Sequence, residues 1–349
     1  MVRVVIVDDS ASVRLFLRQL LTADPEIKVV GTAADGEEAL EVVVRLTPDV
    51  VTMDIHMPRM NGLIATRRLM ETHPLPIVIV SSVLDAEEVA STFHALEAGA
   101  VAAVPLPRGT GQPDAGEEAR SFVQTVKLMA AVKVVRRWRL PAVATPSPAF
   151  LRSRCLGPPV PVQVVAIGAS TGGPPVVQKI LEGVPPAFPA AILIVQHMAT
   201  GFTAGFAKWL NQTSGLPVRL ATHDEQLLPG HAYLAPDGCH MEVAAAGNRI
   251  VLVNTPPENG LRPSVSVLFR SVAHGYGGKA IGVLLTGMGS DGAEGLLLMK
   301  EKGAITIVQD RESSVIHGMP GEALKLDAAT CTLPPEGIIA ALKSLVMEN

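Results

Sequence analysis

Short apolar runs alternate with amphipathic segments along the first part of the chain. The amphipathic character is clear over residues 13–21, where apolar side chains recur at i, i+3, i+4, i+7 and i+8 and form one face of a helix. Strands that alternate with helices predict a parallel sheet covered by helices. The predicted strands are 2–8, 27–33, 49–54, 76–82 and 100–104.

A second part of the chain repeats this alternation. Continuous apolar runs, typical of strands buried on both faces, occur at residues 162–168, 190–197, 280–287 and 304–310. Turn residues are more frequent from about 217 to 260, which predicts short antiparallel strands there. The fold class is therefore α/β with two doubly wound domains. The first is a five-stranded parallel, flavodoxin-like domain, and the second is mostly parallel with a short antiparallel segment.

Proline and glycine separate the two parts. A chain of 349 residues is long enough for two domains. Pro- and Gly-rich sequence begins near residue 108, a helix-like run follows, and the Pro-rich signal returns before residue 160. These features predict a first domain at 1–107, a linker with a helix at 108–160 and a second domain at 161–349.

Composition limits the kinds of partner and site. No apolar run approaches the ~20 residues that cross a bilayer, and the first residues lack the pattern of a signal peptide, so we expect a cytoplasmic protein without membrane insertion. The net charge of -4 gives no basic excess for nucleic acid. The three cysteines include no CxxC pair, which argues against structural zinc.

Three aspartates follow predicted strands of the first domain. Asp8 and Asp9 come at the end of the first strand, and Asp54 comes at the end of the third. The carboxyl ends of neighbouring parallel strands converge on one crevice, where three carboxylates would favour Mg²⁺ and one could act as a nucleophile. The alternative, left open by spacing alone, is that these aspartates only cap the following helices.

A glycine-rich stretch, "GASTGGPP", follows the first strand of the second domain. A phosphate-binding P-loop would need Lys at Pro174, and a dinucleotide-binding loop would need Gly at Ser170, so neither motif fits. Prolines instead suit the first turn of a helix. Ser170 is therefore predicted on a tight turn between a strand and a helix, a position that exposes a nucleophile in several hydrolases.

A nucleophilic serine requires a base. His197 ends the next predicted strand and Asp291 follows a later one, so Ser170, His197 and Asp291 can meet at one sheet edge as a triad. The alternative for Asp291 is that it caps the helix predicted after it.

The first domain resembles the receiver domain of two-component response regulators. The resemblance implies that Asp54 accepts a phosphoryl group, that Asp8, Asp9 and the carbonyl of His56 help to hold Mg²⁺, and that Ser81 is the hydroxyl residue that senses the phosphoryl group. It rests on the motifs "IVDDSASVR", "MDIHMPRMNG" and "IVSS".

The receiver pattern is interrupted in "GAVAAVPLP". Receivers carry a Lys before the last proline of this stretch and an aromatic residue three positions earlier, where this chain has Leu106 and Ala103. Leucine offers no donor to a phosphoryl group. Phosphorylation of Asp54 is still expected, but transmission of the signal is expected to be weaker.

The second domain is similar to the catalytic domain of the chemoreceptor protein-glutamate methylesterase (CheB) family. The resemblance implies that Ser170 attacks a glutamyl methyl ester, that His197 acts as the base, that Asp291 orients it and that the backbone N–H of Met288 binds the oxyanion. Glutamine deamidation by the same residues is also implied. The resemblance rests on "GASTGGP", "VQHM", "YLAPDGCHM", "RPSV", "LLTGMGSDGA" and "QD…SSV…GMP".

The two resemblances together imply regulated adaptation in bacterial chemotaxis. Methylated chemoreceptors would be the substrate, a chemotaxis histidine kinase the phosphodonor and Mg²⁺ the only cofactor, with none for the esterase. A monomer is expected. The alternative is a signalling module that only binds a partner, with a degenerate phospho-switch and constitutive or no esterase activity. A receiver-controlled transcription factor is disfavoured because no helix-turn-helix or basic surface is evident.

Overall fold

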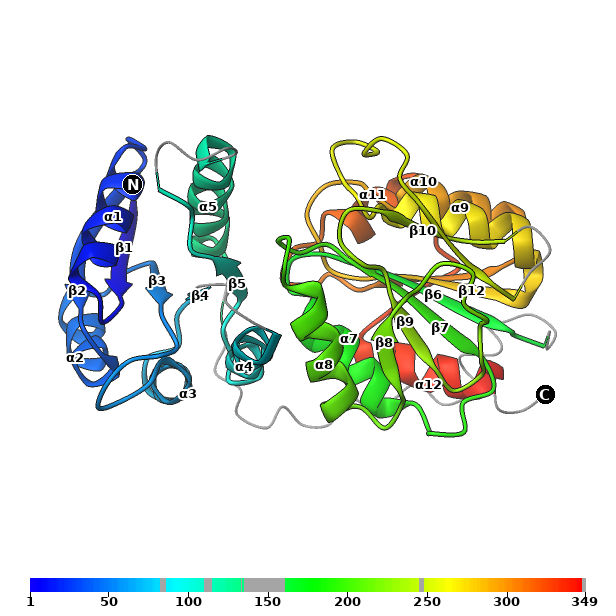
Figure 1. Ribbon diagram of the computed structural model, residues 1–349, viewed down its shortest axis with the longest axis horizontal. Coiled ribbons are helices and arrows are strands. Elements are labelled where there is room, and N and C mark those ends of the chain that lie inside the picture. The colour runs from blue at the N-terminus through cyan, green and yellow to red at the C-terminus, as the bar shows by residue number, and fades with distance from the viewer. Residues whose placement is uncertain (82–85, 110–114, 133, 135–160, 245–247, 347–349) are drawn as a thin grey trace. The chain divides into compact units, whose positions relative to one another are not determined.

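The computed structural model describes residues 1–81, 86–109, 115–132, 134, 161–244 and 248–346. The chain forms two compact units, Met1–Pro141 and Ala142–Asn349 (Figure 1). Within these described ranges, every helix is too short or too polar to serve as a membrane span.

The first unit contains a five-stranded parallel sheet with the order β2-β1-β3-β4-β5. Its strands are apolar because helices cover both faces of the sheet. The strands are β1 Val2–Val7, β2 Ile27–Ala33, β3 Val50–Met53, β4 Ile77–Ser81 and β5 Ala102–Pro105.

Local capping fixes where several helices of this unit begin. The Asp35 carboxylate accepts hydrogen bonds from two backbone N–H groups of α2, and the Asn61 side chain accepts one at the start of α3. Helix α5 packs against α1, β3 and β4 and so belongs to this unit. The helices are α1 Ala11–Thr22, α2 Gly36–Leu46, α3 Gly62–Thr72, α4 Ala86–Glu97 and α5 Ala115–Ala130.

The second unit contains a seven-stranded parallel sheet with the order β14-β13-β12-β6-β7-β9-β8. A separate antiparallel pair is formed by β10 and β11. The strands are β6 Val164–Ala169, β7 Ala191–Gln196, β8 Val218–Leu220, β9 Ala232–Leu234, β10 His240–Val243, β11 Ile250–Val253, β12 Ala280–Leu284, β13 Ile305–Gln309 and β14 Cys331–Leu333.

Helices cover this sheet in two groups. Helix α10 packs against α9 and α11, whereas α7 packs against α8 and α12 (Figure 1). The helices are α7 Gly173–Gly183, α8 Thr203–Thr213, α9 Val265–Tyr276, α10 Ala293–Glu301, α11 Met319–Lys325 and α12 Pro335–Val346, with a 3-10 turn at Gly277–Lys279.

The centre of the second sheet is the best buried part of the unit. Every residue of β6, β7 and β12 is buried, as expected for strands covered on both faces. Strand β7 follows β6 on one side, and β12 flanks β6 on the other. The direction of the chain connections reverses at β6, and such reversal points are where α/β folds form ligand crevices.

The predicted α/β class with two domains is confirmed, including the short antiparallel pair. The prediction of antiparallel strands across 217–260 was wrong for β8 and β9, which extend the parallel sheet. Strand β14 was not predicted. The helix expected within the segment 108–160 is α5, which lies in the first unit. Residues 135–160 of that segment lie outside the described residues.

Candidate active site

Ser170 lies in the turn between β6 and α7. Its N–H donates to the carbonyl of Thr286 at 3.0 Å, and the N–H of Gly173 donates to the carbonyl of Ser170 at 2.8 Å. Gly172, the N-cap of α7, has a φ of 77°, and a Cβ there would lie 2.5 Å from Cβ of Val315. The prolines lie in the first turn of α7 as predicted, so the strand-to-helix turn is confirmed.

His197 follows the last residue of β7. The parallel register pairs Ala169 with Gln196, and the N–H of His197 donates to the carbonyl of Ala169 at 2.9 Å. His197 therefore lies beside Ser170 at the carboxyl ends of adjacent strands. Its side chain is 10 % exposed.

Asp291 lies in the loop between β12 and α10 and holds a buried carboxylate. One carboxylate oxygen, Oδ1, accepts hydrogen bonds from Ser264 Oγ at 2.9 Å and Ser266 N at 3.0 Å. The other, Oδ2, accepts from Val265 N at 2.7 Å and lies 2.9 Å from Nε2 of His197. The start of α9 thus supplies three donors that fix this carboxylate beside the imidazole.

The carboxylate of Asp291 is held in its ionised form. Burial by itself raises the pKa, but the interaction with His197 and the hydrogen bonds from Ser266 outweigh burial and hold the pKa below its usual range. The contact with His197 is short, yet the ring nitrogen is not aligned as in a linear hydrogen bond, which is common in sites without substrate. The N-cap of α10 is Gly292 and has no side-chain cap bond, so the carboxylate does not cap that helix.

The loop at residues 286–289 approaches Ser170 closely. A Cβ on Gly287 would lie 2.6 Å from Cβ of Ser170, so only glycine permits this contact. Met288 follows and is 48 % exposed, and Gly289 has a φ of 82°. The backbone of Met288 is therefore close to the Ser170 turn.

The three residues that the sequence suggested as a triad lie at one edge of the sheet, where the side chains of His197 and Asp291 are in contact. Ser170 follows β6, His197 follows β7 and Asp291 follows β12, so they occupy the ends of three adjacent strands at the reversal point of the sheet. A hydroxyl, an imidazole and a buried carboxylate in this order have the composition required for nucleophilic acyl transfer.

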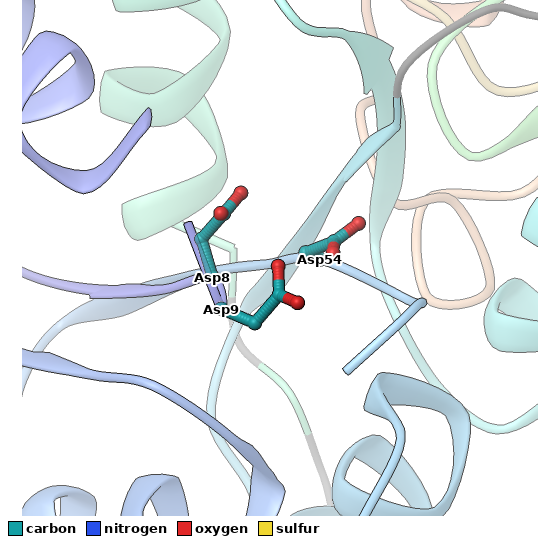
Figure 2. Close-up of side chains that lie close together, drawn as sticks. All are labelled: Asp8, Asp9 and Asp54. Atoms are coloured by element: carbon teal, nitrogen blue, oxygen red, sulfur yellow. The ribbon is translucent and has the colours of Figure 1, made fainter. Parts of the chain in front are cut away.

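Three aspartates of the first unit form a compact acidic cluster. Asp8 and Asp9 follow β1 and Asp54 follows β3, and carboxylate oxygens of all three lie within 4.8 Å of one another (Figure 2). Burial raises the pKa of Asp8 to about 6. The N–H of Ser10 partly offsets that rise, and the charges of Asp54 and Asp9 add to it.

The donor set of this cluster fits a hard divalent cation. Burial raises the pKa of Asp54 even though the backbone N–H groups of Ile55 and His56 bond to its carboxylate. Packing three carboxylates together is costly without a counter-charge, and carboxylate and carbonyl oxygens are the ligands that Mg²⁺ prefers. His56 follows within two residues of Asp54, and its side chain is exposed.

Ser81 and Leu106 are neighbours in the first unit. Ser81 is the last residue of β4, is buried and pairs in register with Pro105. The N–H of Leu106 donates to the carbonyl of Ser81 at 2.9 Å. Ala103 pairs with Ile79 in the same sheet. The apolar Leu106 thus stands next to Ser81 where a receiver has its lysine.

Two family models match the chain. The model described as CheB methylesterase matches residues 165–342, which is more than half of the chain. The chain belongs to the CheB methylesterase family. The model described as response regulator receiver domain matches residues 4–108.

Relatives in the CheB methylesterase family match the whole chain. A protein-glutamate methylesterase/protein-glutamine glutaminase of Geobacter metallireducens is 66 % identical over all of both chains. Its counterpart in Nitrosospira multiformis is 53 % identical over all of this chain and 98 % of its own. The CheB methylesterase catalytic domain of Thermotoga maritima covers 54 % of this chain and 100 % of its own, with 38 % identity and a TM-score of 0.52.

Several residues around Ser170, His197 and Asp291 were not predicted to have a role. Ser264 and Ser266 donate to Asp291, although the sequence analysis only placed Ser264 in the motif "RPSV" and Ser266 directly after it. His240 is fully buried, and its Nδ1 accepts a hydrogen bond from the N–H of Ser264 at 3.1 Å. The amide of Gln196 donates to the carbonyls of two neighbouring residues. The sequence could have indicated a role for Gln196, because it is a polar residue at the end of a buried apolar strand.

Proposed function

We propose that this member of the CheB methylesterase family is a protein-glutamate O-methylesterase that acts on methylated chemoreceptors in bacterial chemotaxis adaptation. The observation that carries the proposal is the 2.9 Å contact between His197 Nε2 and the buried carboxylate of Asp291, beside the Ser170 turn. The relatives named for this activity support the same assignment.

The chemistry follows from the order of the three residues. Because His197 Nε2 lies at Asp291, Nδ1 is the ring nitrogen left to take the proton of Ser170. The hydroxyl oxygen of Ser170 attacks the γ-carbonyl of the glutamyl methyl ester, and His197 passes the proton to the departing methoxy oxygen, which leaves as methanol. Water then attacks the acyl-enzyme with His197 as base; the bond to Ser170 breaks, Ser170 regains its proton, and the receptor side chain is left as a glutamate carboxylate.

Two further groups stabilise charge in this reaction. Asp291 is ionised and stabilises the imidazolium of His197 while fixing its tautomer. The N–H of Met288, close to the Ser170 turn, donates to the oxyanion of the tetrahedral intermediate, and a donor of this kind contributes about 10²- to 10³-fold in kcat. The same steps on a glutamine side chain release ammonia, which gives glutamine deamidation.

The first unit is proposed to regulate the esterase through phosphorylation of Asp54. Asp8, Asp9, Asp54 and the carbonyl of His56 would hold Mg²⁺, which offsets charge on the incoming phosphoryl group. A chemotaxis histidine kinase is the proposed phosphodonor, and Ser81 is the proposed hydroxyl partner of the phosphoryl group. The esterase is proposed to need no cofactor.

The wider organisation is proposed from the sequence. Residues 1–107 would be the receiver, 108–160 the linker and 161–349 the methylesterase domain. We also propose a cytoplasmic monomer that binds neither nucleic acid nor membrane.

Methanol release from methylated chemoreceptor membranes tests the proposal. The purified protein is assayed with and without Mg²⁺ and a small phosphodonor, with Ser170→Ala as the blank. Release that requires Ser170 and rises with the phosphodonor supports both parts of the proposal. Absence of Ser170-dependent release would exclude the esterase function.

A second candidate is a member with a degenerate phospho-switch, and Leu106 in place of the lysine favours it. Such a protein would hydrolyse the ester constitutively or only bind its partner. In the same assay, release that requires Ser170 but does not respond to the phosphodonor identifies the constitutive form.

A further inference from the structure

Gln196 links the backbones of Ser170 and His197. It is the last residue of β7 and is 2 % exposed. Its side-chain Nε2 donates to the carbonyl of Ser170 at 2.7 Å and to the carbonyl of His197 at 2.9 Å. One amide group therefore holds the main chain of both residues.

As far as the chain is described, the NH₂ group of the Gln196 amide is hydrogen-bonded, but its oxygen is not. Its NH₂ group uses both hydrogens, whereas Oε1 is buried and has no hydrogen-bond partner among the residues that the structure describes. Oε1 packs against Gly173, where a side chain would clash with it. A buried acceptor without a partner is costly, and such groups in folded proteins need an explanation.

We propose that Gln196 is a positioning residue that sets the separation between Ser170 and His197; this inference rests on the proposed esterase function. The carbonyl of Ser170 accepts two bonds, one from Gly173 N at 2.8 Å and one from Gln196, so the turn is fixed from both sides. A backbone tie matters because acyl transfer depends steeply on the distance between nucleophile and base.

Other side chains cannot reproduce the tie. A methionine has a similar length and fills the space, but it donates no hydrogen bond. A glutamate keeps the shape but places an ionised oxygen against two carbonyl oxygens, which repel it. Gln196→Met also removes the buried Oε1 that has no partner in the described ranges, which offsets part of the stability lost with the two hydrogen bonds. A fall in kcat can therefore be distinguished from a fall in stability.

The experiment compares Gln196→Met and Gln196→Glu with the full-length wild-type protein. Gln178→Met is the matched control because Gln178 lies on α7 and its side chain donates a hydrogen bond to Glu182, one turn along the same helix. We expect Gln196→Met to keep the melting temperature within a few degrees while kcat falls about 10- to 100-fold, with KM nearly unchanged. Gln196→Glu should lose at least as much kcat, and the control should match wild type.

Each outcome bears on the inference. Rates are divided by the folded fraction from circular dichroism of the same samples, so a partly unfolded variant still gives an answer. A kcat per folded molecule within twofold of wild type for Gln196→Met would overturn the inference, as would a change in KM alone. If wild type itself shows no Ser170-dependent turnover, the proposed function fails instead, and reaction of Ser170 with a fluorophosphonate then compares its nucleophilicity in wild type and variants. Equal labelling rates would likewise overturn the role of Gln196.

Discussion

Replacing Asp291 by asparagine probes the buried carboxylate that lies beside His197. Each carboxylate oxygen faces two donor groups: Ser264 Oγ and Ser266 N at Oδ1, and Val265 N and His197 Nε2 at Oδ2. Asparagine has one oxygen and one NH₂ group. In either orientation the NH₂ group must face a backbone N–H that previously donated to an oxygen.

The magnitude follows from these contacts. The hydroxyl of Ser264 can rotate and accept, so the favoured orientation puts the NH₂ group at the Oδ1 side and leaves the Ser266 N–H unpaired. A buried unpaired donor costs about 1–3 kcal/mol, and we expect the free energy of unfolding to fall by that amount. Loss of the charge beside the imidazolium should lower kcat by about 10³- to 10⁴-fold, the loss typical of triad amides.

The assay is urea unfolding of Asp291→Asn together with methanol release, and Asp327→Asn is the control because that side chain is 95 % exposed. The pKa of Asp291 lies below its ordinary value of 3.8, so the stabilisation by the carboxylate is complete above that pH and is lost as the pH falls through the folded-state pKa. The deficit of the variant should therefore shrink in acid. Equal unfolding curves near neutral pH, or a kcat within tenfold of wild type, would refute the reasoning.

Three other substitutions or conditions test further features of the two units. His240→Asn keeps an acceptor near the N–H of Ser264, whereas His240→Gln moves the acceptor away from that N–H. The asparagine variant should therefore retain a higher kcat than the glutamine variant, and the reverse order would contradict this expectation. Both ring nitrogens of His317 are buried and have no hydrogen-bond partner in the described part of the chain. His317→Leu should therefore raise the free energy of unfolding by about 1 kcal/mol. A variant that is less stable in urea would contradict this expectation. Because the pKa of Asp8 is raised to about 6, protons should compete with Mg²⁺ for its carboxylate. The Mg²⁺ affinity measured by titration calorimetry should therefore weaken as the pH falls through about 6. An affinity independent of pH would rule out Asp8 as a ligand.

Long buried strands were predictable because their sequence is continuously apolar. The runs that became β6, β7 and β12 are typical of strands covered on both faces, and their ends also located the sheet edge where the site lies. Strands β8, β9 and β14 have three residues each, which is too few for a period to indicate whether they join a parallel sheet.

The sequence could predict only those site residues that directly follow strands. Ser170, His197 and Asp291 each follow an apolar run, and parallel strands bring such positions together. The donors from Ser264 and Ser266 come from the start of a helix, and no periodicity relates them to Asp291. Their role depends on side-chain contacts between segments far apart in the sequence.

The order in which the sheet is built from the chain has a consequence for folding. β6 and β7 are consecutive strands, but β12 reaches the other side of β6 only after β8–β11 and α9 have been placed. A nascent chain that ends before β12 has the serine and the histidine but no acidic partner. The unit should therefore lack full activity until Asp291 has been synthesised and β12 has paired with β6.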